Sequence, residues 1–221
     1  MRSNIILAFA LSFFSLTALA EGAAAPAAAP AASTPPDQVV EQTAKDIFDT
    51  VNSRKAELQK DPDQLYDMVS KILLPHFDFA LSSQLVLGQA WRTATAEQRK
   101  AFQDAFFKYL THSYADALVK GDYSERNVKV EPYRPSSQPD RAIVKTQVLL
   151  SGSQPAEVDY VLRNESGQWK AFDVIIEGIS YVHSYHDQFA PEIQKNGLDE
   201  LIKRLSTSKA PNAVPPPATK G

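Results

Sequence analysis

The sequence predicts an α+β fold in which helices cover a curved, four-stranded antiparallel sheet. Three observations lead to this fold class. Apolar residues recur at helical spacing up to residue 120, they alternate in short segments from residue 128 to residue 177, and helical spacing then returns. Only short turn-forming stretches separate the alternating segments, which favours antiparallel neighbours. Helices, then an antiparallel sheet, then helices again is the element order of an α+β domain.

The helices are marked by amphipathic stripes and by capping residues. Two segments have the residues typical of helix starts. One is Asp61-Pro62 followed by Gln64, and the other is Thr95 followed three residues later by Gln98. The short apolar stretch over residues 77–88 predicts one or two small helices. The longer helices are expected over residues 36–60, 62–74, 95–120, 179–195 and 198–205.

The strands are expected over residues 128–133, 142–150, 156–163 and 169–177. On the third and fourth strands one face is apolar. Its members are Val158, Tyr160, Leu162, Phe172, Val174 and Ile176, and those on the opposite face include Glu157, Asp159, Arg163, Ala171, Asp173 and Ile175. A strongly twisted sheet under a helical cover can leave a hollow between the layers. We therefore expect an apolar cavity between the sheet and its helices.

Composition divides the chain into four segments. Arg2 precedes an uncharged apolar run, and Ala18 and Ala20 place small residues where a signal peptidase cleaves, so we expect export and cleavage after Ala20. The run is shorter than the roughly 20 residues that span a bilayer, and the mature chain is expected to be soluble. The four segments are a signal peptide (residues 1–20), an Ala/Pro-rich disordered spacer (21–37), one folded domain (38–208) and a disordered Pro-rich tail (209–221).

Charge and cysteine content exclude several classes of protein. The chain has no cysteine, which rules out disulfides, a thiol nucleophile and a lipid-modified N-terminal cysteine. The formal net charge is −3, and loss of Arg2 with the signal peptide makes it −4 (−3 − 1). A mildly acidic chain without a basic stripe argues against nucleic acid as a partner.

Three segments, in this order and spacing, resemble the MlaC, or toluene-tolerance, family of periplasmic phospholipid-binding proteins. They are Leu85-Val86-Leu87-Gly88 followed by Trp91, Thr95-Ala96-Glu97-Gln98-Arg99 leading into Phe102 and Phe106, and the segment from Gln168 to Ser180 that includes Trp169-Lys170-Ala171-Phe172-Asp173. The resemblance covers about residues 39–205, and residues 169–180 are its most specific part. No single segment is a catalytic signature.

The resemblance implies a fold similar to nuclear transport factor 2 and a function without chemistry. The folded domain would be a periplasmic lipid carrier that shuttles glycerophospholipids between outer- and inner-membrane complexes and maintains outer-membrane lipid asymmetry. Its partners would be an inner-membrane ABC transporter with an MCE-domain ring and an outer-membrane lipoprotein–porin complex. No cofactor is implied, and a shuttle is most simply a monomer.

The residues expected to contact the lipid tails are apolar members of the predicted stripes. They are Leu85, Phe102, Phe106, Leu110, Val158, Tyr160, Leu162, Phe172, Val174 and Ile176. Any one of them could instead belong to a plain core, because apolar alternation marks buried positions in every fold. The hypothesis is that some members of the set touch ligand.

Three alternatives stay open. Folds of this shape also host isomerases and dehydratases, for which Asp159 or Asp173 would serve as general base and Tyr160 as hydrogen-bond donor, although both aspartates are expected on the solvated face. A pure docking module could use surface around Trp91 and Arg92, or residues 181–185.

Metal binding is the third alternative. The four histidines are His76, His112, His183 and His186. His183 and His186 are three residues apart on a predicted helix, with Asp187 adjacent, but no third ligand is evident nearby. Surface histidines are the expected outcome, because a lone spaced pair is a weak motif.

Overall fold

The computed structural model describes residues 34–120, 128–149 and 155–207. The expected signal peptide, all but the last residues of the spacer (21–37) and the tail (209–221) lie outside these residues. The helices are α1 (Pro36–Leu58), α2 (Pro62–Leu73), the 3-10 helix η1 (Leu74–His76), α3 (Phe79–Leu87), α4 (Gln89–Thr93), α5 (Ala96–Lys120), α6 (Tyr181–Asn196) and α7 (Leu198–Thr207). Among the described residues, none of the helices combines the length and the apolar character that crossing a membrane requires.

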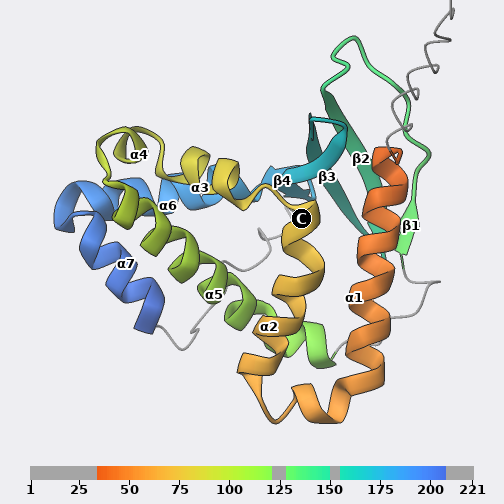
Figure 1. Ribbon diagram of the computed structural model, residues 1–221, viewed down its shortest axis with the longest axis horizontal. Coiled ribbons are helices and arrows are strands. Elements are labelled where there is room, and N and C mark those ends of the chain that lie inside the picture. Colours follow the sequence, from red (N-terminus) through yellow and green to blue (C-terminus); the bar gives the residue numbers. More distant parts are fainter. Residues whose placement is uncertain (1–33, 121–127, 150–154, 208–221) are drawn as a thin grey trace, which may run out of the picture. The chain divides into compact units, whose positions relative to one another are not determined.

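The sheet is an antiparallel meander, and it confirms the α+β fold class (Figure 1). Its strands are β1 (Val128–Val130), β2 (Arg141–Val148), β3 (Ala156–Glu165), β4 (Gln168–Ile176) and β5 (Ile179–Ser180), paired in that order. The short strand β5 was expected to be the start of a helix. Glu177 and Gly178 both have positive φ, at 49° and 78°, which suits the tight turn that folds β5 back onto β4.

A β-bulge in β4 changes the faces that simple alternation predicts. Val161 pairs with Asp173, but Leu162 pairs with Ala171, so Phe172 is the extra residue between them. Ala171 and Val174 therefore both lie on the inner face of the sheet, whereas Phe172, the unpaired residue of the bulge, does not. The expected grouping of Phe172 with Val174 and Ile176 is wrong, because one inserted residue reverses the alternation on one side of it.

Helix α3 is fastened to the bulged part of β4 by polar contacts. Ser82 donates its hydroxyl to the carbonyl of Phe172 at 2.6 Å, and the backbone N–H of Asp78 donates to the carbonyl of Ala171 at 2.7 Å. The Asp78 carboxylate caps α3 by accepting from the N–H of Leu81 and forms an ion pair with Arg163 of β3. These bonds fix where α3 lies against the sheet.

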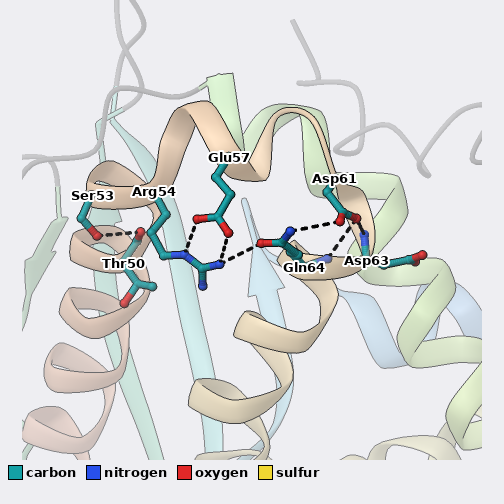
Figure 2. A network of polar contacts seen from close by, with 7 residues as sticks. All are labelled: Thr50, Ser53, Arg54, Glu57, Asp61, Asp63 and Gln64. Atoms are coloured by element: carbon teal, nitrogen blue, oxygen red, sulfur yellow. Dashed lines mark hydrogen bonds and ion pairs between the residues drawn. The ribbon is translucent and has the colours of Figure 1, made fainter.

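Helices α1 and α2 form an antiparallel pair whose turn carries a polar network (Figure 2). Arg54 has non-helical backbone angles (φ −117°, ψ 15°) and donates two hydrogen bonds to Glu57, at 2.9 and 2.8 Å. Arg54 also donates to Gln64 of α2, whose side chain donates to Asp61. Asp61 caps α2 by accepting from the N–H groups of Asp63 and Gln64, as its sequence predicts.

Three apolar clusters hold the described part of the chain together. The first joins α3, α5, α6 and α7 through aromatic residues such as Phe102, Phe106 and Phe189. The second joins α1, α2 and α5, with Val51 and Leu65 at its centre. The third lies between α1 and the inner face of the sheet, where Val40 packs against residues such as Val144 and Leu162, and Figure 1 shows α1 beside β1 and β2.

Candidate functional site

An apolar cavity lies where the three clusters meet the sheet, and it has two compartments. The first has a volume of about 330 Å³ and lies between α2, α3, α5, α6 and β4. It is lined by Val69, Leu73, Phe77, Phe79, Ser82, Val86, Phe106, Phe107, Leu110, Thr111, Leu118, Phe172, Asp173, Val174, Ile176, Tyr181, Val182 and Tyr185. The second, of about 320 Å³, lies between α1 and the inner face of β3 and β4. Its lining residues are Val39, Val40, Thr43, Ala44, Ile47, Leu73, His76, Phe77, Val158, Tyr160, Leu162, Ala171, Val174 and Ile176.

The two compartments are neighbours. Leu73, Phe77, Val174 and Ile176 line both of them. Phe77 precedes α3 and forms an isolated parallel bridge with Ala171, which holds it against the edge of β4. Val174 and Ile176 follow the bulge on the inner face. The compartments thus share part of their wall, and each lies at the lower end of the volume range of small-molecule pockets.

Three polar side chains in the wall of the first compartment, those of Ser82, Thr111 and Asp173, are bonded within the chain. Ser82 bonds to Phe172, and Thr111 donates to the carbonyl of Phe107 at 3.0 Å. Asp173 accepts from the N–H of Val174 at 2.8 Å, the hydroxyl of Ser180 at 2.6 Å and the N–H of Val182 at 3.0 Å. Satisfied polar groups leave a wall that presents mainly carbon to an occupant.

The second compartment is also mainly apolar, and three of its lining side chains, Thr43, His76 and Tyr160, carry polar groups. Thr43 donates its hydroxyl to the carbonyl of Val39 at 2.7 Å. His76 is exposed, so the compartment reaches solvent beside it. Tyr160 lies at the middle of β3, and burial among apolar neighbours raises the pKa of its hydroxyl.

The structure places eight of the ten predicted tail-contacting residues in the cavity wall. Phe106, Leu110 and Phe172 line the first compartment, Val158, Tyr160 and Leu162 the second, and Val174 and Ile176 both. Whether these residues touch a ligand stays a prediction.

Leu85 and Phe102 lie elsewhere. Leu85 is on the outward side of α3 and is 41% exposed. Phe102 is fully buried one helical turn from Phe106, with its ring 5.3 Å from that of Phe106 and 6.3 Å from that of Phe189. Phe102 is therefore part of the solid core, because α6 closes directly onto it.

Several lining residues were missed by the sequence reasoning. Phe77 and Phe79 lie in the stretch assigned only to small helices, and Val39, Val40 and Ile47 belong to the stripe of α1. The α1 stripe was a usable signal, since a helix that packs on a sheet faces the same space as the strands. The bridge that positions Phe77 has no local sequence signature.

The structure gives the two candidate general bases different roles. Asp159 is on the outer face of β3, opposite Lys145, and does not line either compartment. Asp173 is buried at 9% exposure, so its expected place on the solvated face is wrong. The bulge and the cap of α6 explain this burial, because the carboxylate takes the donors that begin the helix and the hydroxyl of Ser180, which itself accepts from His183.

The histidines that could have formed a metal site take separate partners. His183 pairs with Asp187 at 3.4 Å on the surface of α6. His186 contacts the carbonyl of Val86 at 3.0 Å and packs on Gly88, where an added Cβ would lie 2.7 Å from its ring. In the described ranges, no cluster of three or more His, Cys, Asp or Glu side chains could hold a metal ion.

The residues suggested for docking are partly structural. Arg99 donates to the carbonyl of Trp91 at 3.0 Å, and its guanidinium lies 5.1 Å from the centre of the indole ring. Tyr185 is buried in the first cluster, at 2% exposure. Arg92 is exposed.

Known proteins share both sequence and fold with this chain. The family described as MlaC protein matches residues 41–207. The toluene tolerance protein ttg2D of Pseudomonas putida is 33% identical over 178 residues, which are 80% of this chain and 81% of that protein. The intermembrane phospholipid transport system binding protein MlaC of Haemophilus influenzae is 26% identical over 206 residues, 92% of this chain and 91% of that protein.

A solved structure agrees with these matches. It is a phospholipid-binding protein from Ralstonia solanacearum in complex with a phospholipid, which matches with a TM-score of 0.70 and 26% sequence identity and covers 78% of this chain and 95% of that chain. The resemblance that the sequence motifs indicated is confirmed. The chain belongs to the MlaC protein family.

Proposed function

We propose that this chain is a phospholipid carrier that holds the acyl chains of a glycerophospholipid in the two-compartment cavity. The observation that carries the proposal is the cavity itself: two adjoining apolar spaces of about 330 and 320 Å³ that share four lining residues. A diacyl lipid has two apolar chains joined at one polar end. Adjoining compartments match that shape, with one chain in each.

The physical need for such a carrier is large. Moving a lipid through water exposes both chains, at about 0.8 kcal/mol per methylene, which for two chains of about 16 carbons is on the order of 20 kcal/mol. A cavity with carbon walls removes this cost without selecting a headgroup. Release then requires that a partner offers the chains an equally apolar place.

We infer that the carrier performs no chemistry. Asp173, which lines the first compartment, is engaged by three hydrogen bonds within the chain, so it is poorly placed to abstract a proton from an occupant. The relatives named above are phospholipid-binding or transport proteins by name. Energy for a directional step would come from a partner.

The cellular setting belongs to the same proposal. The N-terminal signal peptide (residues 1–20) would export the chain to the periplasm, with cleavage after Ala20 and with the spacer and tail flanking one carrier domain. There it would act as a monomer and shuttle phospholipid between an outer-membrane lipoprotein–porin complex and an inner-membrane ABC transporter with an MCE-domain ring. This transport would maintain outer-membrane lipid asymmetry.

Native mass spectrometry of protein purified without detergent tests the proposal. The wild type should carry a mass increment that matches phospholipid. Val174→Trp places an indole at the boundary of both compartments and should remove most bound lipid, whereas Leu110→Trp and Leu162→Trp each fill one compartment and should have smaller effects. Ile143→Trp is the matched control, because Ile143 is 54% exposed on the outer face of β2. Protein-sized mass alone for the wild type, or undiminished lipid in Val174→Trp, would contradict the proposal.

A further inference from the structure

Tyr160 lines the second compartment, and its hydroxyl is a hydrogen-bond donor that no described residue of the chain uses. Tyr160 is in the middle of β3, and its cross-strand neighbours on the inner face are Val144 and Val174. Helix α1 covers this part of the sheet with apolar residues such as Val40 and Ile47. Within the described part of the chain, the Tyr160 hydroxyl makes no hydrogen bond.

Other hydroxyl groups nearby do find partners. Thr43, in the same compartment, donates to the carbonyl of Val39 at 2.7 Å. Tyr133, which packs on the same cluster outside the compartment, contacts the carbonyl of Arg141 at 3.5 Å. Burial among apolar neighbours raises the pKa of the Tyr160 hydroxyl. Tyr160 is half-buried and lines an apolar compartment, and its hydroxyl has no partner among the described residues, so it points to an acceptor from outside the chain.

The location of Tyr160 fits the polar end of an acyl chain. Leu162 lies two residues further along β3 and pairs with Ala171, which forms a bridge with Phe77. The residue directly before Phe77 in the chain is His76, which is exposed. Two strand positions correspond to about 7 Å. Tyr160 is thus within reach of the solvent-accessible side of the compartment, where the hydrocarbon of a bound chain would begin.

The chemistry of an acyl lipid supplies the acceptor. Methylene groups offer no hydrogen-bond acceptor, and the first acceptor along an acyl chain is its carbonyl oxygen. An ester of a phospholipid and the carboxyl of a free fatty acid both carry it. An alkyl ether at the same place lacks the carbonyl. A donor in this position therefore distinguishes acyl from alkyl lipids.

We propose that the Tyr160 hydroxyl donates a hydrogen bond to an ester carbonyl of the bound phospholipid, so that the carrier prefers ester-linked to ether-linked lipids. The inference rests on the proposed function and adds a chemical selectivity that apolar walls alone do not give. One neutral hydrogen bond of typical strength corresponds to a three- to tenfold difference in Kd.

A binding experiment with matched ligands tests this inference. Delipidated wild type, Tyr160→Phe and the control Tyr133→Phe are titrated with a diacyl phosphatidylcholine, with its dialkyl ether analogue of equal chain length, and with palmitic acid. The wild type and Tyr133→Phe should bind the diacyl lipid three- to tenfold more tightly than the ether lipid. Tyr160→Phe should bind both with the same Kd, near that of the wild type for the ether lipid.

Thermal unfolding of the same proteins separates this role from a structural one. Without lipid, Tyr160→Phe should unfold at the same Tm as the wild type or above it, because the substitution removes a hydroxyl that has no partner in the described chain. With the diacyl lipid bound, its Tm should rise less than that of the wild type.

Three results would overturn the inference. They are equal binding of ester and ether lipids by the wild type, an ester preference that survives in Tyr160→Phe, and an effect of Tyr160→Phe on palmitic acid alone, which would assign the acceptor to a free carboxyl. Failure of the wild type to bind either phospholipid would instead contradict the proposed carrier function, and this inference with it.

Discussion

The helical core and the cavity are built from the same kinds of side chain, yet one is solid and the other is hollow. In the core, the ring of Phe106 is 5.3 Å from Phe102, 5.6 Å from Phe189 and 5.0 Å from Tyr185. Two helices, α5 and α6, thus close on one another through their aromatic faces. Phe106 and Tyr185 also line the first compartment, so the boundary between packed interior and open space runs along side chains of the core itself.

The difference between the two regions lies in what sets the distance between their elements. The core helices are joined by polar contacts too, such as Arg204 of α7 with Glu192 of α6, but their apolar side chains interlock. Around the cavity, polar contacts hold the elements where side chains do not interlock. Ser82 and Asp78 hold α3 to β4, Asp173 holds the start of α6 to β4, and Arg54 joins α1 to α2 through Gln64. We infer that these contacts keep the walls apart.

The largest expected effect on stability comes from the same type of change, leucine to alanine, made once in the core and once in the cavity wall. Leu201→Ala removes a fully buried side chain of the core, and Leu110→Ala removes one that already borders open space. Without lipid, the core change should cost about 4 kcal/mol and the cavity change about 2 kcal/mol, because less packing is lost beside a void. Urea unfolding of delipidated protein measures both. Equal costs would mean that the cavity wall is packed like the core.

The second largest effect is expected from removing Asp78, which anchors α3 to the sheet. Asp78→Ala deletes the cap of α3 and the partner of Arg163, which keeps one third of its side chain exposed. We expect a loss of about 2 to 3 kcal/mol in the free energy of unfolding, together with weaker lipid binding. Chemical denaturation measures the free energy of unfolding, and native mass spectrometry measures the bound lipid. Full lipid occupancy in a destabilised variant would show that α3 does not set the cavity.

Asp173→Asn tests the anchor that holds the start of α6 to β4. The amide keeps the shape of the carboxylate but weakens its bonds to Ser180 and Val182, so we expect a loss of about 1 to 2 kcal/mol with lipid still bound. Ser180→Ala alone should cost about 1 kcal/mol, and the two changes should not add, because they break one network. Additive losses would contradict a shared cap.

The smallest effect is expected at the turn between α1 and α2. Arg54→Ala breaks the contacts with Glu57 and Gln64, but exposed pairs of this kind contribute little to stability because solvent screens them. The Tm should change little, and lipid occupancy should stay at the wild-type level. A marked loss of lipid would mean that the α1–α2 turn, rather than α3 and α6, determines how far the compartments open.

Local patterns predicted the elements well, because helix caps and alternation are encoded within a few residues. Asp61 and Thr95 marked two helix starts correctly. The bulge at Phe172 was not predictable, since it depends on Ser82 and Asp78, about 90 residues away in the chain. Strand β5 (Ile179–Ser180) is a local hairpin with β4, but two residues are too few to show an alternating pattern.

The cavity could be predicted as a region but not residue by residue. Phe102 and Phe106 are one turn apart on the same apolar stripe, and only the second meets open space. Hydrophobic periodicity reports burial, which a core and a lined cavity share. What separates them is the spacing of the surrounding elements, which long-range polar contacts determine.

The most direct test of the account is photo-crosslinking with a diacyl phospholipid that carries a photoreactive group at the end of one acyl chain. Peptide mapping should place the label on wall residues of both compartments, such as Leu110 and Leu162, and Val174→Trp should abolish it. Labels confined to exposed residues such as Ile143 and Leu85 would show that lipid binds at the surface and would contradict the cavity as its site.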